Sequence, residues 1–198
     1  MSARDLIPIG AIVLLLAGCG TVDEPAAPTS PTVTSAPIPT ASATADGSAD
    51  PSEDLPWDDS SEGAAAPGSA LTATGLSTET PEGYDRVVLE LSGTGTPGWL
   101  ATRSATAVEN PTGETLEMSG EGYLAVVVTG LTQPESDTAL DAGTIGDGGT
   151  VVTGTEFTGV FEGEAQLWLG LSDPDAPYRI HVLNDPTRLV VDVQRSMA

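Results

Sequence analysis

The stretch that decides the fold reads YRIHVLNDPTRLVVDV and runs from Tyr178 to Val193. Two runs rich in aliphatic residues, 178–183 and 188–193, flank the four residues Asn-Asp-Pro-Thr. Proline presets φ, and Asn or Asp favours entry into a turn, so these four residues are a good turn sequence. Apolar and polar residues alternate in the first run, as they do in a half-buried strand. The stretch therefore predicts a β-hairpin.

Runs of the same kind occur upstream, separated by Gly, Pro and Asp. We predict further strands at residues 87–91, 123–128, 157–162 and 165–171, and a Gly- and Asp-rich loop over 140–150. No convincing helical period is present after Leu71. Short, evenly spaced strands are typical of sandwiches and barrels. We therefore expect residues 71–198 to form one small all-β domain, a β-sandwich.

The hairpin resembles the closing strands of AMIN domains, which read Leu-x-x-Pro-x-Arg-Leu-Val-x-Asp-Leu. Here the matching residues run from Leu183 through Pro186, Arg188 and Asp192 to Val193. The chain is similar to the AMIN-like domain of actinobacterial lipoproteins, loosely over 71–195 and well over 165–194, although the upstream strand lacks the family's Arg. This resemblance implies a β-sandwich that binds peptidoglycan and localises its host to the cell wall.

The sequence before the domain has a different composition. Residues 19–70 are rich in Pro, Ser, Thr and Ala, and residues 20–70 carry nine acidic residues but no basic one. Such a segment cannot bury enough apolar surface to offset its chain entropy, so we expect a disordered tether with a mean reach of about 40 Å. Its one apolar stretch is 55–57, Leu-Pro-Trp. We interpret this stretch as an incidental hydrophobic spot, and the alternative is a short docking motif.

The N-terminus predicts export and lipidation. Arg4 precedes an apolar run from Leu6 to Leu16, which ends in Ala-Gly-Cys. The run is too short to span a membrane as a helix, and residues 1–18 have the layout of a signal peptide. The residues before Cys19 resemble a bacterial lipobox, which implies a diacylglycerol on that thiol. We expect a protein anchored by this lipid at the extracytoplasmic face of the membrane.

The charge balance restricts the partners. The chain has 29 acidic residues against 6 arginines and no lysine, for a net charge of −23. Nucleic acid is excluded because binding its phosphates requires a basic footprint. Anionic wall polymers and headgroups are disfavoured for the same reason. Neutral glycans, cationic peptides and divalent cations stay open as ligands.

The sequence predicts no catalytic site and no cofactor. His181 is the only histidine, and no Gly-x-Ser-x-Gly motif accompanies it. Zinc is bound by three or four His, Cys or carboxylate ligands, so a chain with one histidine is a poor candidate for a zinc site. The loop containing Asp137, Asp141 and Asp147 could offer oxygen ligands to calcium, but its spacing differs from an EF-hand. We interpret it as a solvated loop and predict no metal site.

A ligand surface is predicted from strand periodicity. If the leucines of strand 165–171 face the core, Trp168 faces outward. Arg179 and His181 lie on the face of their own strand opposite Ile180. We take Trp168, Arg179 and His181 as candidate ligand-binding residues for a glycan or muropeptide. The alternative is that Trp168 packs under a loop and that the other two are solvated.

Other charged and aromatic positions are interpreted as structural. Arg188 and Asp192 share one face of their strand, and Arg86 and Glu90 repeat this spacing. Along one strand these residues are too far apart to touch, so any ion pairs would be cross-strand and, if exposed, weak. Trp99 follows a Pro-Gly turn and is expected in the core.

Two main function hypotheses follow, and a small-ligand or calcium carrier is a third alternative. The first is a non-enzymatic envelope lipoprotein whose domain binds peptidoglycan or another wall component. The second is a protein-interaction module that positions or regulates a wall enzyme.

Overall fold

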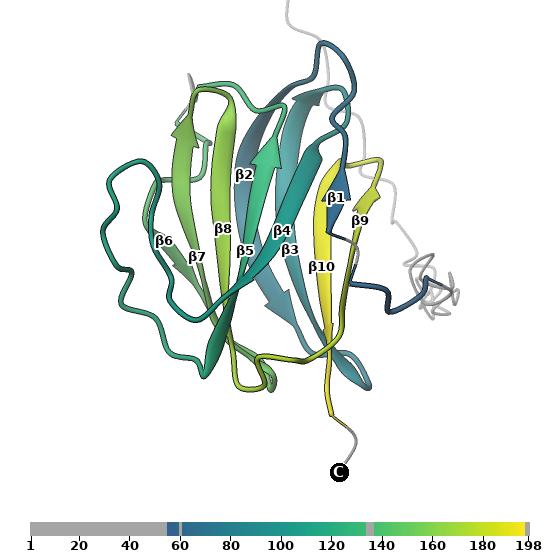
Figure 1. Ribbon diagram of the computed structural model, residues 1–198. Helices are drawn as coiled ribbons and strands as arrows, with labels where there is room; N and C mark the ends of the chain where they lie inside the picture. The colour runs from purple at the N-terminus through teal and green to yellow at the C-terminus, as the bar shows by residue number, and fades with distance from the viewer. Residues whose placement is uncertain (1–54, 60, 134–136, 197–198) are drawn as a thin grey trace, which may run out of the picture. The chain divides into compact units, whose positions relative to one another are not determined.

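Two antiparallel β-sheets pack face to face in the computed structural model, which describes residues 55–59, 61–133 and 137–196 (Figure 1). The signal peptide, Cys19 and the predicted tether up to residue 54 lie outside the described residues. The strands are β1 Glu62–Gly63, β2 Ala70–Glu79, β3 Tyr84–Thr94, β4 Gly98–Ser104, β5 Gly122–Thr129, β6 Thr144–Gly146, β7 Val152–Phe161, β8 Glu164–Leu171, β9 Tyr178–Leu183 and β10 Arg188–Gln194. The predicted all-β sandwich is confirmed.

The predicted hairpin lies in the smaller sheet. This four-stranded sheet has the order β2-β3-β10-β9, and the six-stranded sheet has the order β1-β4-β5-β8-β7-β6. Strands β9 and β10 pair antiparallel with Val182 opposite Leu189, so the hairpin is confirmed. Asp185, in the turn between them, has a positive φ of 58°, a conformation that Asp tolerates better than most residues.

Alternating side chains from both sheets build the core. Leu167 and Leu169 of β8, Leu89 of β3 and Val191 of β10 are fully buried between the sheets. Phe157 is the largest fully buried side chain, and the core otherwise consists mostly of Leu, Val and Ala. Burying one Leu, Val or Phe side chain contributes roughly 1.5–3 kcal/mol, so these positions carry much of the stability. Trp99 also packs against this core, as predicted.

The domain begins before Leu71, contrary to the predicted boundary. Strand β1 pairs with β4, and Gly63 lies opposite Trp99. An added Cβ at Gly63 would lie within 3 Å of the indole ring, so only glycine permits this contact. Further upstream, Asp59 accepts a hydrogen bond from the Tyr178 backbone N–H at 2.9 Å. Residues 55–59 and 61–70 therefore belong to the domain rather than to a disordered tether.

Three other strands, β2, β4 and β6, were absent from the sequence prediction. Strand β4 lacks the usual alternation because its apolar Leu100 is half exposed, whereas its polar Arg103 reaches back to the carbonyl oxygens of Pro174 and Ala176. Strand β6 lies within the predicted Gly- and Asp-rich loop, where three residues pair with β7.

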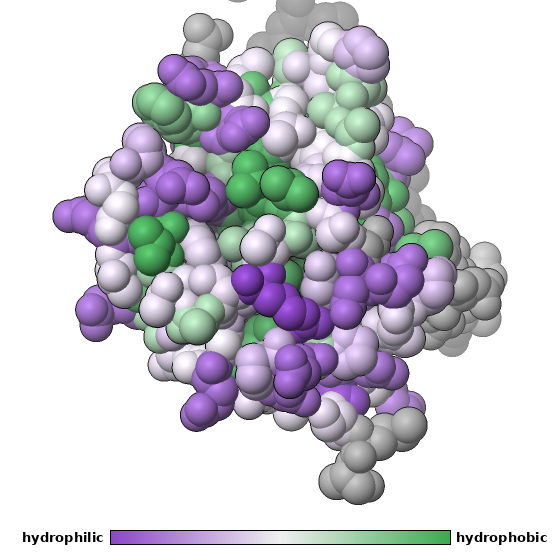
Figure 2. Space-filling view, in the orientation of Figure 1, coloured by the Kyte–Doolittle hydropathy of each residue, from purple (hydrophilic) through white to green (hydrophobic). Residues whose placement is uncertain are grey.

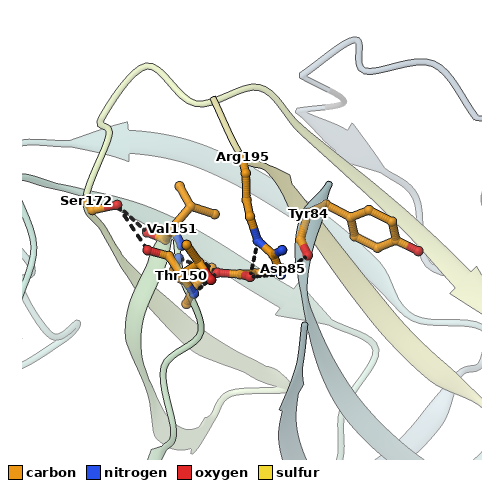
Figure 3. A network of polar contacts seen from close by, with 7 residues as sticks. Tyr84, Asp85, Thr150, Val151, Ser172 and Arg195 are labelled. Carbon is orange, nitrogen blue, oxygen red and sulfur yellow. Dashed lines mark hydrogen bonds and ion pairs between the residues drawn. The ribbon is translucent and has the colours of Figure 1, made fainter. Parts of the chain in front are cut away.

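A buried carboxylate closes one end of the sandwich. Asp85 of β3 is fully buried, and its Oδ2 accepts hydrogen bonds from the backbone N–H groups of Thr150, Val151 and Val152 at 2.5, 2.6 and 3.0 Å. Its Oδ1 accepts two from the Arg195 guanidinium at 2.8 and 3.0 Å, so loop and C-terminal segment converge on one side chain (Figure 3). This network stabilises the connection into β7.

Candidate functional site

Trp168 is not the exposed aromatic that the strand pattern suggested. It does lie on the outer face of β8, but only 4% of it is exposed. The β4–β5 connection, residues 105–121, crosses this face, and Ala107 packs against the indole together with Ala125 of β5. The prediction of an exposed Trp168 is wrong, and the alternative, packing under a loop, is correct.

Arg179 and His181 lie on the other sheet. Their strand, β9, belongs to the four-stranded sheet, and both side chains are on its outer face. The two outer faces of a sandwich point in opposite directions, so Trp168 does not share a surface with either residue. Arg179 and His181 are also buried, with 3% and 9% exposed, rather than solvated. The three predicted residues do not form one platform.

Arg179 belongs to a buried ion-pair network across three strands. Asp192 of β10 is opposite both Arg86 of β3 and Arg179 of β9. Arg86 donates to both carboxylate oxygens of Asp192 at 2.7 and 2.9 Å, and Arg179 donates its Nε–H at 2.9 Å. Pairing is cross-strand, as predicted, but the pairs are buried rather than exposed. Breaking such a pair is costly because it leaves a buried charge without compensation.

The segment 55–57 lies against this network. The Trp57 ring centroid is 4.2 Å from the Arg179 guanidinium carbon, and the Leu55 carbonyl accepts a hydrogen bond from Arg179 Nη1 at 2.9 Å. Trp57 also makes an edge contact with the ring of Tyr84, with centroids 5.8 Å apart. The segment 55–57 is therefore not an incidental hydrophobic spot, because it packs on its own domain.

A different surface combines an exposed aromatic ring with polar groups. Figure 2 shows the outer face of the six-stranded sheet, where a hydrophobic patch near the middle is surrounded by polar side chains. Beside β5, β7 and β8 this face contains a cavity of about 110 Å³, which we call the Phe161 hollow. Its lining residues are Asn110, Pro111, Val127, Thr158, Gly159, Phe161, Glu164, Ala165 and Gln166.

A β-bulge places Phe161 at this hollow. Phe157 faces the core, and strict alternation would turn Phe161 inward as well. The β7–β8 register shifts between Phe157 and Val160, and Gly159 adopts a φ of 92° that favours glycine. Val160 consequently packs against the core, and Phe161 is 55% exposed. Sequence periodicity therefore missed Phe161, and Gly159 was the only local signal of a bulge.

A two-residue turn and the long loop complete the hollow. Glu162 and Gly163 both have positive φ, the geometry of a tight hairpin turn between β7 and β8. The Asn110 backbone N–H donates to Gln166 Oε1 at 2.7 Å, which holds the tip of the 105–121 loop against β8. The rim of the hollow is thus formed by segments far apart in the sequence.

The side chains around the hollow are acidic rather than cationic. Glu164 lines it, and Glu156 lies on the same strand face as Thr158. Burial raises the pKa of Glu156, and the Glu109 carboxylate raises it further. No arginine lines the hollow, so its chemistry suits a neutral ligand better than an anionic one.

Within the described ranges no group of three or more His, Cys, Asp and Glu side chains is placed to hold a metal ion. In the same part of the chain no helix is long and apolar enough to cross a membrane.

Comparison with known proteins identifies the family. The model of the AMIN-like domain matches residues 71–195, which is more than half of the chain. No curated protein and no solved structure matches. AMIN-like domains are typically extracytoplasmic modules of the cell envelope, and the match suggests a binding or interaction module related to the cell wall. The chain belongs to the AMIN-like domain family.

Proposed function

We propose that this protein is a non-enzymatic lipoprotein whose AMIN-like domain binds peptidoglycan through the Phe161 hollow. The observation that carries the proposal is the exposed Phe161 ring beside a cavity of mixed apolar and polar lining on the outer face of the six-stranded sheet. Sugars pack their C–H-rich faces on flat apolar rings, while their hydroxyls bind neighbouring amides and hydroxyl groups. Binding sites combine an apolar surface with a few placed polar groups in this way.

The charge of the chain supports a neutral glycan as the contacted part of the wall. A net charge of −23 repels anionic polymers, and Glu164 at the hollow adds to this effect locally. The glycan backbone can be bound without placing an anion against these carboxylates.

The membrane anchor is part of the proposal. Cys19 would carry a diacylglycerol, and the signal peptide 1–18 would be removed, which attaches the domain to the extracytoplasmic face of the membrane. Two acyl chains suffice for stable anchoring because each buried methylene contributes about 0.8 kcal/mol. Intact-mass analysis of the native product tests this, and a retained leader with an unmodified thiol would contradict it.

Wall binding is tested by co-sedimentation of the full chain with purified sacculi in mild detergent. We expect the wild type to sediment and Phe161→Ser to lose most of the binding. Ile145→Ser is the matched control, because Ile145 is a large apolar side chain that is 75% exposed on the same sheet but outside the hollow. Equal losses of sedimentation in both variants would indicate non-specific hydrophobic adsorption to the sacculi. Absence of sedimentation of the wild type would refute wall binding.

A protein-interaction module is the second candidate. It is favoured by Leu100 and Ile145, which expose apolar side chains on the same sheet without lining the hollow. Crosslinking in cells distinguishes the two candidates. Glycan-peptide adducts support wall binding, whereas one dominant protein adduct supports the interaction module.

A further inference from the structure

The Phe161 hollow is too small for a whole sugar ring with its substituents. Its volume is about 110 Å³. Pockets that enclose complete small ligands are larger, roughly 300–1,000 Å³. The hollow therefore fits one substituent of a ligand that otherwise lies outside it, against the exposed Phe161 ring.

The lining of the hollow is mixed, with more apolar than polar surface. Val127 and Phe161 supply apolar surface, and Gln166 supplies a carboxamide. Gln166 as a whole residue is only 7% exposed. Gln166 Oε1 accepts the Asn110 backbone N–H, which leaves the two Nε2 hydrogens as donors. No described residue accepts a hydrogen bond from Nε2. An acceptor oxygen on the ligand would satisfy this amide.

An acetamido group matches both the volume and the lining. It has four non-hydrogen atoms, a carbonyl oxygen that accepts a hydrogen bond, and a methyl group that needs apolar contact. It is uncharged, which suits a cavity lined by Glu164 in a strongly acidic protein. A phosphate or carboxylate substituent would meet no arginine among the lining residues.

We propose that the Phe161 hollow is a subsite for the acetamido group of an N-acetylated amino sugar. The methyl group contacts Val127 and Phe161, the carbonyl oxygen accepts from Gln166 Nε2, and the sugar ring lies against the exposed Phe161 face. This inference rests on the proposed wall binding and specifies which chemical group is recognised. The glycan strand, rather than the peptide stem, is then the contacted part of the wall.

The test uses two neutral tetrasaccharides that differ only in the substituent. Full-length protein in detergent micelles is titrated with the β-1,4-linked tetramer of N-acetylglucosamine and with cellotetraose, which carries hydroxyl groups instead of acetamido groups. We expect the N-acetylated tetramer to bind at least about tenfold more tightly, because a site built around a hydrogen bond discriminates against a ligand that lacks it. Backbone amide resonances of Gly159 and Gln166 should shift on binding.

Variants localise the effect. Val127→Phe fills the hollow from an outer-face position, so it should remove the preference for the N-acetylated tetramer. Ile145→Ser is the control and should keep the preference. If Val127→Phe does not fold, Phe161→Ser tests the same point, because an exposed side chain can be truncated with little effect on stability.

Failure of this inference is distinguishable from failure of wall binding. Equal binding of the two tetrasaccharides overturns the acetamido subsite, and so do resonance shifts confined to other strands. Sedimentation with sacculi without any binding of the tetramer also overturns it, while the proposed wall binding stands. Absence of sedimentation overturns the proposed function itself.

Discussion

The Arg179 guanidinium carbon lies 4.2 Å from the centroid of the Trp57 ring, although 122 positions separate the two residues in the sequence (179 − 57 = 122). This contact holds Trp57, which lies between the predicted membrane anchor and the domain in the sequence, against the outer face of the four-stranded sheet. Because Arg179 also pairs with Asp192, the stacked ring covers a buried ion-pair network. The segment 55–57 is therefore a structural part of the AMIN-like domain.

Trp57→Ala should destabilise the domain. Loss of the cation–π contact removes roughly 1–2 kcal/mol at a site that is largely desolvated. Trp57→Phe retains a stacked ring and should lose less. Urea denaturation measures the free energy of unfolding, and limited proteolysis should show faster cleavage near Leu55 in the Ala variant alone. Identical unfolding midpoints in all three proteins would show that the contact is unimportant.

Asp192→Asn should be more harmful. The substitution leaves the buried guanidinium groups of Arg86 and Arg179 without their carboxylate, at a cost of about 3–5 kcal/mol. Glu90→Gln on the neighbouring strand, where the side chain is exposed, should change stability by less than about 0.5 kcal/mol. Thermal unfolding followed by circular dichroism compares the two, and equal melting temperatures would contradict the role assigned to Asp192.

Asp85→Asn should loosen the end of the sandwich shown in Figure 3. An amide cannot serve both the three loop N–H groups and Arg195, so we expect a loss of roughly 3 kcal/mol. Amide hydrogen exchange should accelerate at Thr150–Val152 before it does in β8. Asp147→Asn, an exposed change in the same loop, is the control and should leave exchange at these amides unchanged.

Glu156→Gln should stabilise the domain at neutral pH. The pKa of Glu156 is raised by burial and by Glu109, so the folded protein holds the proton more tightly than the unfolded chain does. The ionised side chain therefore opposes folding above its folded pKa, and this penalty decreases as the pH falls through that value and vanishes below the pKa of the unfolded chain. The gain over wild type should be present at pH 7 and vanish under acidic conditions. Glu121→Gln, at an exposed site, controls for the reduced net charge.

The revised domain boundary predicts the behaviour of shortened chains. Residues 71–198 lack β1 and the contacts of Asp59 and Trp57, whereas residues 55–198 retain them. The shorter chain should therefore melt at a lower temperature than the longer one. Equal melting temperatures would mean that residues 55–70 contribute nothing to folding.

Local sequence patterns determined six of the ten described strands and the family. The 178–193 hairpin follows from a turn sequence between two aliphatic runs, and the inward face of β8 follows from its alternating leucines. These features depend on neighbouring residues alone. The match to the AMIN-like family over 71–195 also depends on sequence alone, because a family model compares residues in their order along the chain.

Tertiary structure decided which side chains are accessible. The 105–121 loop covers Trp168, Trp57 covers Arg179, and a bulge at Gly159 turns Phe161 outward. Strand periodicity assigns a residue to a face, but exposure depends on what packs over that face, and those segments lie far away in the sequence. The exposed aromatic ring at the candidate site is therefore that of Phe161, because long-range packing buries Trp168.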